Sequence, residues 1–183
     1  MREKRSWIER RQQILAARPA PTCPDFSDGQ TVYLWGESRR LRLEPAARGR
    51  NAFLRDQDIV LQVHPGDTPA QRQALLNSFY RAQLDARIRA CLPYWEGKTG
   101  LHPASVQIKN MKTRWGTCNT AAKRIWLNLQ LVKQPPVCLD YVLAHELTHL
   151  LHPDHGNGFW AFLLRVMPDC KAIRKALNET PFL

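Results

Sequence analysis

The sequence predicts an α+β fold: a small N-terminal antiparallel β lobe, one long helix, and a C-terminal part in which helices follow a second group of strands. Three observations support this. Short runs of alternating apolar and polar residues, separated by turn residues, occupy positions 31–63. A capping box at Thr68 and Gln71 then opens a long stretch with helical spacing of apolar residues. Strand-like and helix-like segments follow without an internal repeat, an order typical of α+β proteins.

Length and composition indicate a globular protein. The chain has 183 residues, of which 44% are apolar, enough for one domain with a core and too apolar for a mainly disordered protein. No run reaches the ~18–20 apolar residues of a membrane span. The N-terminus is basic without an apolar signal region, so we expect a cytoplasmic protein. Five widely spaced cysteines without a Cys-x-x-Cys pair argue against a disulfide framework and against a thiolate zinc site.

The first elements can be placed in order. Residues 1–29 are predicted to be a basic extension, with an amphipathic helix over 5–17 and a proline-rich linker over 18–24. Residues 30–183 form the predicted domain. Its first sheet is expected from three strands, which we place at Thr31–Trp35, Arg40–Glu44 and Ile59–Val63.

The later elements are marked by prolines and caps. The long helix begins after Thr68 and is predicted to stop at Pro93, because proline lacks the amide hydrogen that the helix needs. Two strands are predicted at Ser105–Lys109 and Arg124–Leu129, with a glycine-containing turn region between them. A helix from about Cys138 to His152 follows two prolines, and a last helix, capped by Asn157, ends before Pro168.

The charge is strongly basic and unevenly distributed. The formal net charge is +11, and no Asp or Glu occurs between Gly97 and Leu139. That interval holds seven basic residues: Lys98, Lys109, Lys112, Arg114, Lys123, Arg124 and Lys133. A second cluster includes Arg39, Arg40 and Arg42. Such surfaces attract DNA or other polyanions, although a solvated, solubilising surface explains the charge alone equally well.

Two histidines stand four residues apart in the segment YVLAHELTHLLHPDH, residues 141–155. On a helix, His145 and His149 project from one face, one turn apart, and two imidazole nitrogens can then bind one zinc ion at about 2.0–2.1 Å. Apolar neighbours predict that this helix is buried, where histidines are costly without a partner. Glu146, beside the first ligand, can take a proton from a zinc-bound water and pass it to a leaving group.

A third ligand is needed, because a catalytic zinc site has three protein ligands and one open position. His152 lies seven residues after His145, about 10 Å along the same helix, which is too far for one tetrahedral ion. Pro153 ends the helix, so the chain can fold back and bring His155 to the metal. The geometry therefore favours His155 and leaves His152 beside the ligands or at the surface.

At this point the chain resembles the YgjP-like predicted zinc metallopeptidases, relatives of the SprT and WLM-type proteases. Three blocks carry the resemblance: MKTRWGTC at 111–118, IWLNL at 125–129 with its Asn128, and the His145–Glu146–His149 motif with His155, Phe159–Trp160 and Met167–Asp169. Thr117, Asp154 and Gly156 depart from the usual residues without touching the ligands. The resemblance covers residues 30–178 and leaves 1–29 outside.

The resemblance implies a zincin-like C-terminal part, with Zn²⁺ held by His145, His149 and His155 and with Glu146 as the catalytic acid and base. The expected function is a zinc-dependent peptidase acting on a protein or peptide, with DNA or another polyanion as a further partner. The related SprT and WLM-type proteases cleave proteins bound to DNA.

Two other functions remain open. A metal-dependent nucleotide pyrophosphatase would use the same zinc and Glu146, although the chain lacks a carboxylate cluster for magnesium-bridged phosphates. A nucleic-acid-binding module with a structural zinc would leave Glu146 without a role and the zinc without a fourth protein ligand.

The segment 114–118 also allows more than one role. Arg114 is a candidate for binding an anionic group, and Gly116 either lets the backbone approach a substrate or the metal helix or only forms a turn. Trp115 is expected to pack under the same helix, and Cys118 is expected to be a free thiol near the metal. Candidates for stabilising an oxyanion are His152, Arg114 and Tyr141.

Overall fold

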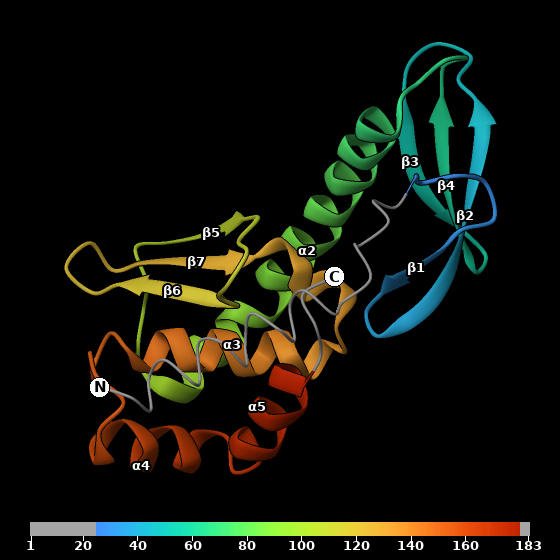
Figure 1. The fold of residues 1–183 in the computed structure, drawn as a ribbon. Helices are drawn as coiled ribbons and strands as arrows, with labels where there is room; N and C mark the ends of the chain where they lie inside the picture. The colour runs from blue at the N-terminus through green and yellow to red at the C-terminus, as the bar shows by residue number, and fades with distance from the viewer. Residues whose placement is uncertain (1–24, 180–183) are drawn as a thin grey trace, which may run out of the picture.

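The computed structural model describes residues 25–179 and has the predicted α+β architecture (Figure 1). One sheet lies at the N-terminal end of a long helix, and a second sheet with three further helices lies toward the other end (Figure 1). The helix predicted over 5–17 and the linker over 18–24 lie outside the described residues. Within residues 25–179, no helix is long and apolar enough to cross a membrane.

The first sheet has four strands in the order β1-β2-β4-β3, and it is mixed rather than wholly antiparallel. The strands are β1 (Thr31–Leu34), β2 (Glu37–Pro45), β3 (Asn51–Arg55) and β4 (Asp58–Val63). The hairpins β1–β2 and β3–β4 are antiparallel, whereas β2 and β4 pair in parallel. The prediction of a wholly antiparallel sheet was wrong because it lacked β3. The chain first forms this edge strand, and β4 then returns between β3 and β2 in the direction of β2.

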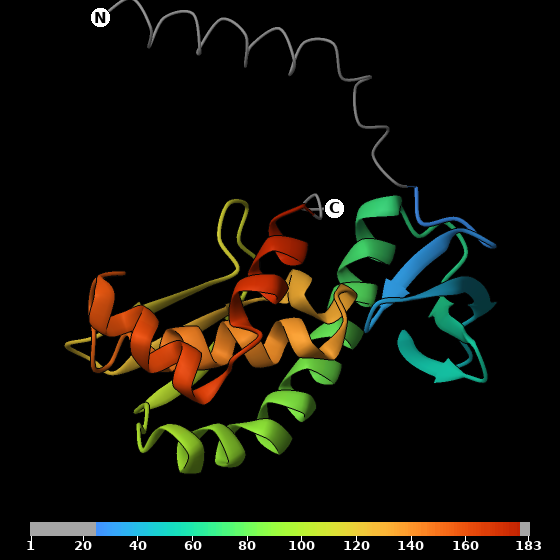
Figure 2. The same ribbon diagram turned by 90° about the horizontal axis from the view of Figure 1, so that it is seen from below.

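The long helix α2 (Pro69–Thr99) begins as predicted and ends six residues beyond the predicted stop. The capping box at Thr68 and Gln71 is present. Pro93 lies inside the helix, and Figure 2 shows α2 bending toward its C-terminal end, as a proline inside a helix causes. The helix continues past Pro93 because the side chain of Trp95, which is 4% exposed, packs in the core. Its Nε1 donates a hydrogen bond to Asp140 at 2.9 Å. Gly100 ends it in the left-handed conformation, with φ of 70°.

The second sheet has the order β5-β7-β6 and consists of β5 (Ser105–Lys109), β6 (Gly116–Asn119) and β7 (Arg124–Asn128). β5 and β7 match the predicted strands and pair in parallel. β6 lies where only a turn region was predicted, and it pairs antiparallel with β7. Its short sequence, GTCN, has no alternation that would mark a strand. A 3₁₀ helix, η1 (Leu129–Lys133), then connects the sheet to the next helix.

Helix α3 (Pro136–Thr148) lies between the second sheet and the last two helices, α4 (Asn157–Val166) and α5 (Cys170–Glu179) (Figure 1). It is shorter than predicted, because the residues after Thr148 form tighter turns. α4 agrees with the prediction, whereas α5 was not predicted. Leu139, Leu143 and Leu147 of α3 are fully buried, so the hydrophobic effect fixes this helix between the two layers.

The first sheet is attached directly to the chain that precedes α3. The backbone amides of Trp35 and Gly36 donate to the carbonyls of Val132 and Lys133 in η1, at 2.7 and 3.2 Å. A Cβ at Gly36 would lie 2.9 Å from Pro135 Cγ, and the residue has a φ of 86°. Only glycine fits both the conformation and the contact.

Candidate metal centre

His145, His149 and His155 come together at the C-terminal end of α3. Their candidate ligand nitrogens all lie within 4.8 Å of one another, and the Nε2 atoms of His145 and His155 are 3.0 Å apart. Within residues 25–179 this is the one cluster of three or more His, Cys, Asp or Glu side chains that could hold a metal ion. The three histidines that the sequence analysis singled out by their spacing thus bring three nitrogen donors close to one another in the structure.

The chain brings the three imidazoles together by ending the helix at the second one. His149 is the C-cap of α3 with helical φ and ψ, so it keeps its position one turn after His145. Tight turns follow, in which Leu150 and Leu151 donate to carbonyls three residues earlier. Asp154 then accepts from the amide of Gly156 at 3.0 Å, and this turn presents His155 to the other two histidines.

His152 takes a different place from the three. Its ring packs against Phe162, with centroids 6.1 Å apart, and its Cε1 would lie 3.0 Å from a Cβ at Gly158. Its backbone carbonyl lies 3.1 Å from His149 Nδ1. A carbonyl can only accept, so Nδ1 of His149 carries the hydrogen and Nε2 is left as the donor to a metal. This contact was not predicted, because the order of residue types does not indicate which backbone carbonyl a side chain will meet.

Phe159 forms the floor under all three histidines. Its ring centroid lies 4.9 Å from that of His145, 4.8 Å from His149 and 4.7 Å from His155. The side chain is 1% exposed. A rigid aromatic ring in contact with every candidate ligand restricts their rotation. The sequence placed Phe159 in the family motif without indicating this contact.

Glu146 is a buried carboxylate, 5% exposed, on the same turn of α3 as the histidines. It packs against β6 at Gly116, where an added Cβ would lie 2.6 Å from Glu146 Oε1 and 2.8 Å from Val142 Cγ1. The close approach suggested for Gly116 is therefore present, and it is made to the acidic residue of the motif. Burial raises the pKa of Glu146 to about 8, and the positive charge of Arg114 opposes this rise.

The donor set fits a zinc ion. Burial, then the neighbouring His149 and His155, lowers the pKa of His145 to about 3, and burial followed by His149 lowers the pKa of His155. These imidazoles are therefore neutral, the form in which a histidine binds metal. Three imidazole nitrogens around one point, with a carboxylate beside them, match the ligand chemistry of a catalytic zinc site.

Other residues of the predicted site have mainly structural contacts. Asn128 is fully buried; its amide nitrogen donates to the carbonyls of Met111 and Arg114, and its oxygen accepts from the amides of Met111 and Gln130. It thereby fixes the loop before Gly116. Cys118 is outside the histidine cluster, and burial, followed by Glu146, raises its thiol pKa to about 11. Tyr141 Oη lies 3.5 Å from His145 Nδ1.

The predicted basic surface divides into paired and unpaired parts. Arg39 and Arg42 of the first sheet form ion pairs with Glu37 and Asp58. In the second sheet, Lys109 and Arg124 are exposed and form no ion pair within residues 25–179, and the Arg124 guanidinium lies 5.6 Å from the ring centre of Trp126. The polyanion partner stays a prediction for this second group.

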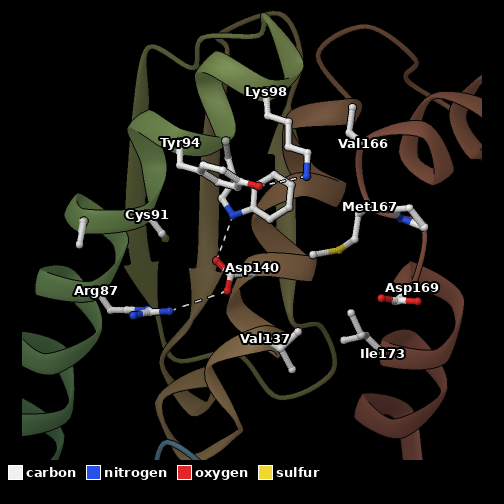
Figure 3. A pocket seen from close by; sticks show the side chains of 13 residues that line it. Arg87, Cys91, Tyr94, Lys98, Val137, Asp140, Val166, Met167, Asp169 and Ile173 are labelled. Carbon is white, nitrogen blue, oxygen red and sulfur yellow. Dashed lines mark hydrogen bonds and ion pairs between the residues drawn. The ribbon is translucent and has the colours of Figure 1, made fainter.

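A separate cavity of about 530 Å³ lies between α2, the start of α3 and the start of α5 (Figure 3). Asp140 stands at its centre, where it accepts from Trp95 Nε1 and forms an ion pair with Arg87 at 3.8 Å (Figure 3). Lys98 donates to the Tyr94 hydroxyl at 3.0 Å. No histidine of the described chain lines this cavity, so it is distinct from the metal centre.

Three imidazoles converge beside a buried carboxylate, on a helix covered by a small sheet, an arrangement typical of metal-dependent hydrolases. The family comparison agrees with this class. The profile of the YgjP-like family, described as a metallopeptidase domain, matches residues 1–180, and the chain belongs to this family. The match includes residues 1–29, which the sequence resemblance had left outside.

No curated protein sequence matches the chain significantly. Among solved structures, the metallopeptidase zymogen of Pyrococcus abyssi, abylysin, shares 23% sequence identity with a TM-score of 0.46. That similarity covers 49% of this chain and 90% of abylysin.

Proposed function

We propose that the protein is a zinc-dependent peptidase in which His145, His149 and His155 hold the metal and Glu146 moves protons. The observation that carries this proposal is the position of Glu146: a carboxylate one residue after a candidate ligand, buried against Gly116. Zinc held by the three histidines would supply a Lewis acid that polarises the scissile carbonyl and lowers the pKa of a water.

The chain's own residues supply the remaining steps. Glu146 accepts the proton of the attacking water and then gives it to the amine that leaves, so no free hydroxide or amide anion forms. The contact with Gly116 limits where its carboxylate can lie. The carbonyl of His152 and the ring of Phe159 hold the imidazoles in place before substrate arrives.

The substitution Glu146→Gln tests the proposal, because it keeps the size of the side chain and removes its basicity. Zinc-loaded wild-type protein should digest denatured casein, and zinc-loaded Glu146→Gln should retain zinc and lose at least about a hundredfold in rate. Casein left intact by the wild type, with nucleoside triphosphates hydrolysed instead, would establish the pyrophosphatase. No turnover of either substrate, with one zinc bound per chain, would favour the binding module.

A further inference from the structure

Two arginines beside the metal centre lack a carboxylate partner. Of the twelve other arginines in residues 25–179, six form ion pairs with acids, namely Arg39, Arg42, Arg50, Arg55, Arg87 and Arg89, and six do not. Arg114 and Arg174 form none with any residue of 25–179, and both are exposed. Exposed unpaired arginines at a reaction centre are available to a ligand, whereas paired ones are already neutralised.

Arg174 is held near the ligands by an aromatic side chain. Its guanidinium lies 5.1 Å from the ring centre of Trp160, and that ring is stacked with His155 at a centroid distance of 6.1 Å and an interplanar angle of 28°. Two successive ring contacts therefore connect the guanidinium to the candidate ligand His155. Stacking restricts the side chain and lowers the entropy lost when it binds an anion.

Arg114 approaches the same centre from the other side of α3. It lies two residues before Gly116, the first residue of β6, where an added Cβ would lie 2.6 Å from Glu146 Oε1; Figure 1 shows β6 and α5 on opposite sides of α3. The acid next to His155 in the chain is Asp154, which caps the amide of Gly156. One exposed carboxylate does not neutralise two arginines, so the centre attracts anions.

We propose that Arg174 binds a carboxylate side chain of the substrate beside the scissile bond, so that the enzyme prefers acidic peptides. The positive charge of Arg114 adds to the electrostatic attraction of the carboxylate, but Arg114 is not required for the contact between Arg174 and the substrate. This inference rests on the proposed peptidase function. A guanidinium donates two parallel hydrogen bonds to a carboxylate, and the corresponding amide can reproduce neither this geometry nor the charge. Arg174 therefore distinguishes glutamate from glutamine at one position of a peptide.

The test compares two peptides that differ only in Glu or Gln next to a bond cleaved in casein. Wild-type protein should favour the Glu peptide by about tenfold in kcat/KM, because the KM of this peptide is lower. The preference should fall as salt is added. Arg174→Gln should bring the ratio close to one by lowering kcat/KM for the Glu peptide more than for the Gln peptide, and Arg174→Lys should keep part of the preference. Lys175→Gln is the matched control, because Lys175 lies on the same helix and pairs with Glu179 instead.

A binding measurement separates failure of this inference from failure of the proposed function. Fluorescence anisotropy of labelled peptides measures binding to the zinc-loaded Glu146→Gln protein, which should bind the Glu peptide more tightly than the Gln peptide. This preference should be lost in the double variant that also carries Arg174→Gln. An equal ratio in wild type and Arg174→Gln, with Gln-peptide cleavage intact, overturns the role of Arg174. If neither peptide is cleaved, the peptidase proposal fails, and the anisotropy ratio alone decides whether Arg174 recognises acidic chains.

Discussion

Gly116 is the position at which a single methyl group would disturb the proposed acid and base most directly. In Gly116→Ala the new Cβ would lie 2.6 Å from Glu146 Oε1, 2.8 Å from its Cγ and 2.8 Å from Val142 Cγ1. Ordinary contacts begin near 3.4 Å, so the Glu146 carboxylate must move by about 0.8 Å. Displacement of a catalytic group by about 1 Å costs about a hundredfold in rate.

The same substitution should change stability much less than activity. Overpacking costs about 1–3 kcal/mol, and the loss of glycine freedom in the unfolded chain offsets about 0.4–1 kcal/mol of it. We expect the zinc content to stay at one per chain, because the ligands lie on the residues around Glu146 and not on β6.

The assay is casein digestion by zinc-loaded Gly116→Ala, beside urea unfolding and zinc analysis of the same sample. Gly97→Ala is the matched control, since its Cβ would meet nothing within 4 Å and it lies in α2; alanine there should be neutral or stabilising by up to about 1 kcal/mol. Full activity in Gly116→Ala would refute the claim that this contact positions Glu146. Loss of zinc together with activity would place the damage at the ligands instead.

Four further outcomes are expected. Asn128→Ala should lower the free energy of unfolding by about 3 kcal/mol, because buried backbone groups lose their hydrogen-bond partners. Urea titration measures this loss, with Asn119→Ala at an exposed position as the control, and equal losses in the two variants would contradict the prediction. Phe159→Ala should lower the free energy of unfolding by about 3–5 kcal/mol and weaken zinc retention against a chelator, whereas Phe162→Ala should leave retention unchanged. Burial, then Asp140, raises the pKa of Cys91 to about 11, so peptide-level alkylation should be slow at pH 8 and rise toward pH 11; fast labelling at pH 8 would disprove this. If Lys109 and Arg124 contact DNA, changing either to Gln should lower the salt-dependence slope of binding by about 0.9, and Arg42→Gln should not.

The metal centre was the part most fully determined by local sequence. His145 and His149 needed only helical spacing, and Pro153 indicated the change of direction that brings His155 back. These inferences depend on a few adjacent residues and on fixed backbone geometry. The contact between Gly116 and Glu146 joins positions thirty residues apart, so the sequence could suggest a close approach there without naming its partner.

Long-range pairing and tertiary packing account for most of what was missed. Parallel pairing of β2 with β4 depends on the placement of β3, a half-exposed strand with weak alternation. α2 continues past Pro93 because Trp95 packs in the core and bonds to Asp140, which lies 45 residues later. α5 was not predicted, although Asp169, a residue type that favours helix N-caps, directly precedes it, and the position of Arg174 was missed with it. The pairing of β2 with β4 and the length of α2 are decided by partners that are distant in the chain.

The attachment of the first sheet to η1 bears on how this protein can be divided or fused. The hairpin amides of Trp35 and Gly36 bond to η1 directly before α3, and Gly36 lies against Pro135. A shortened version that begins at α2 would expose two carbonyls and the apolar surface at the start of the helix that carries the histidines. Minimal catalytic fragments should therefore retain β1 and β2. The exposed turn at Asp56 and Gln57 between β3 and β4 is a better site for an inserted tag or partner domain.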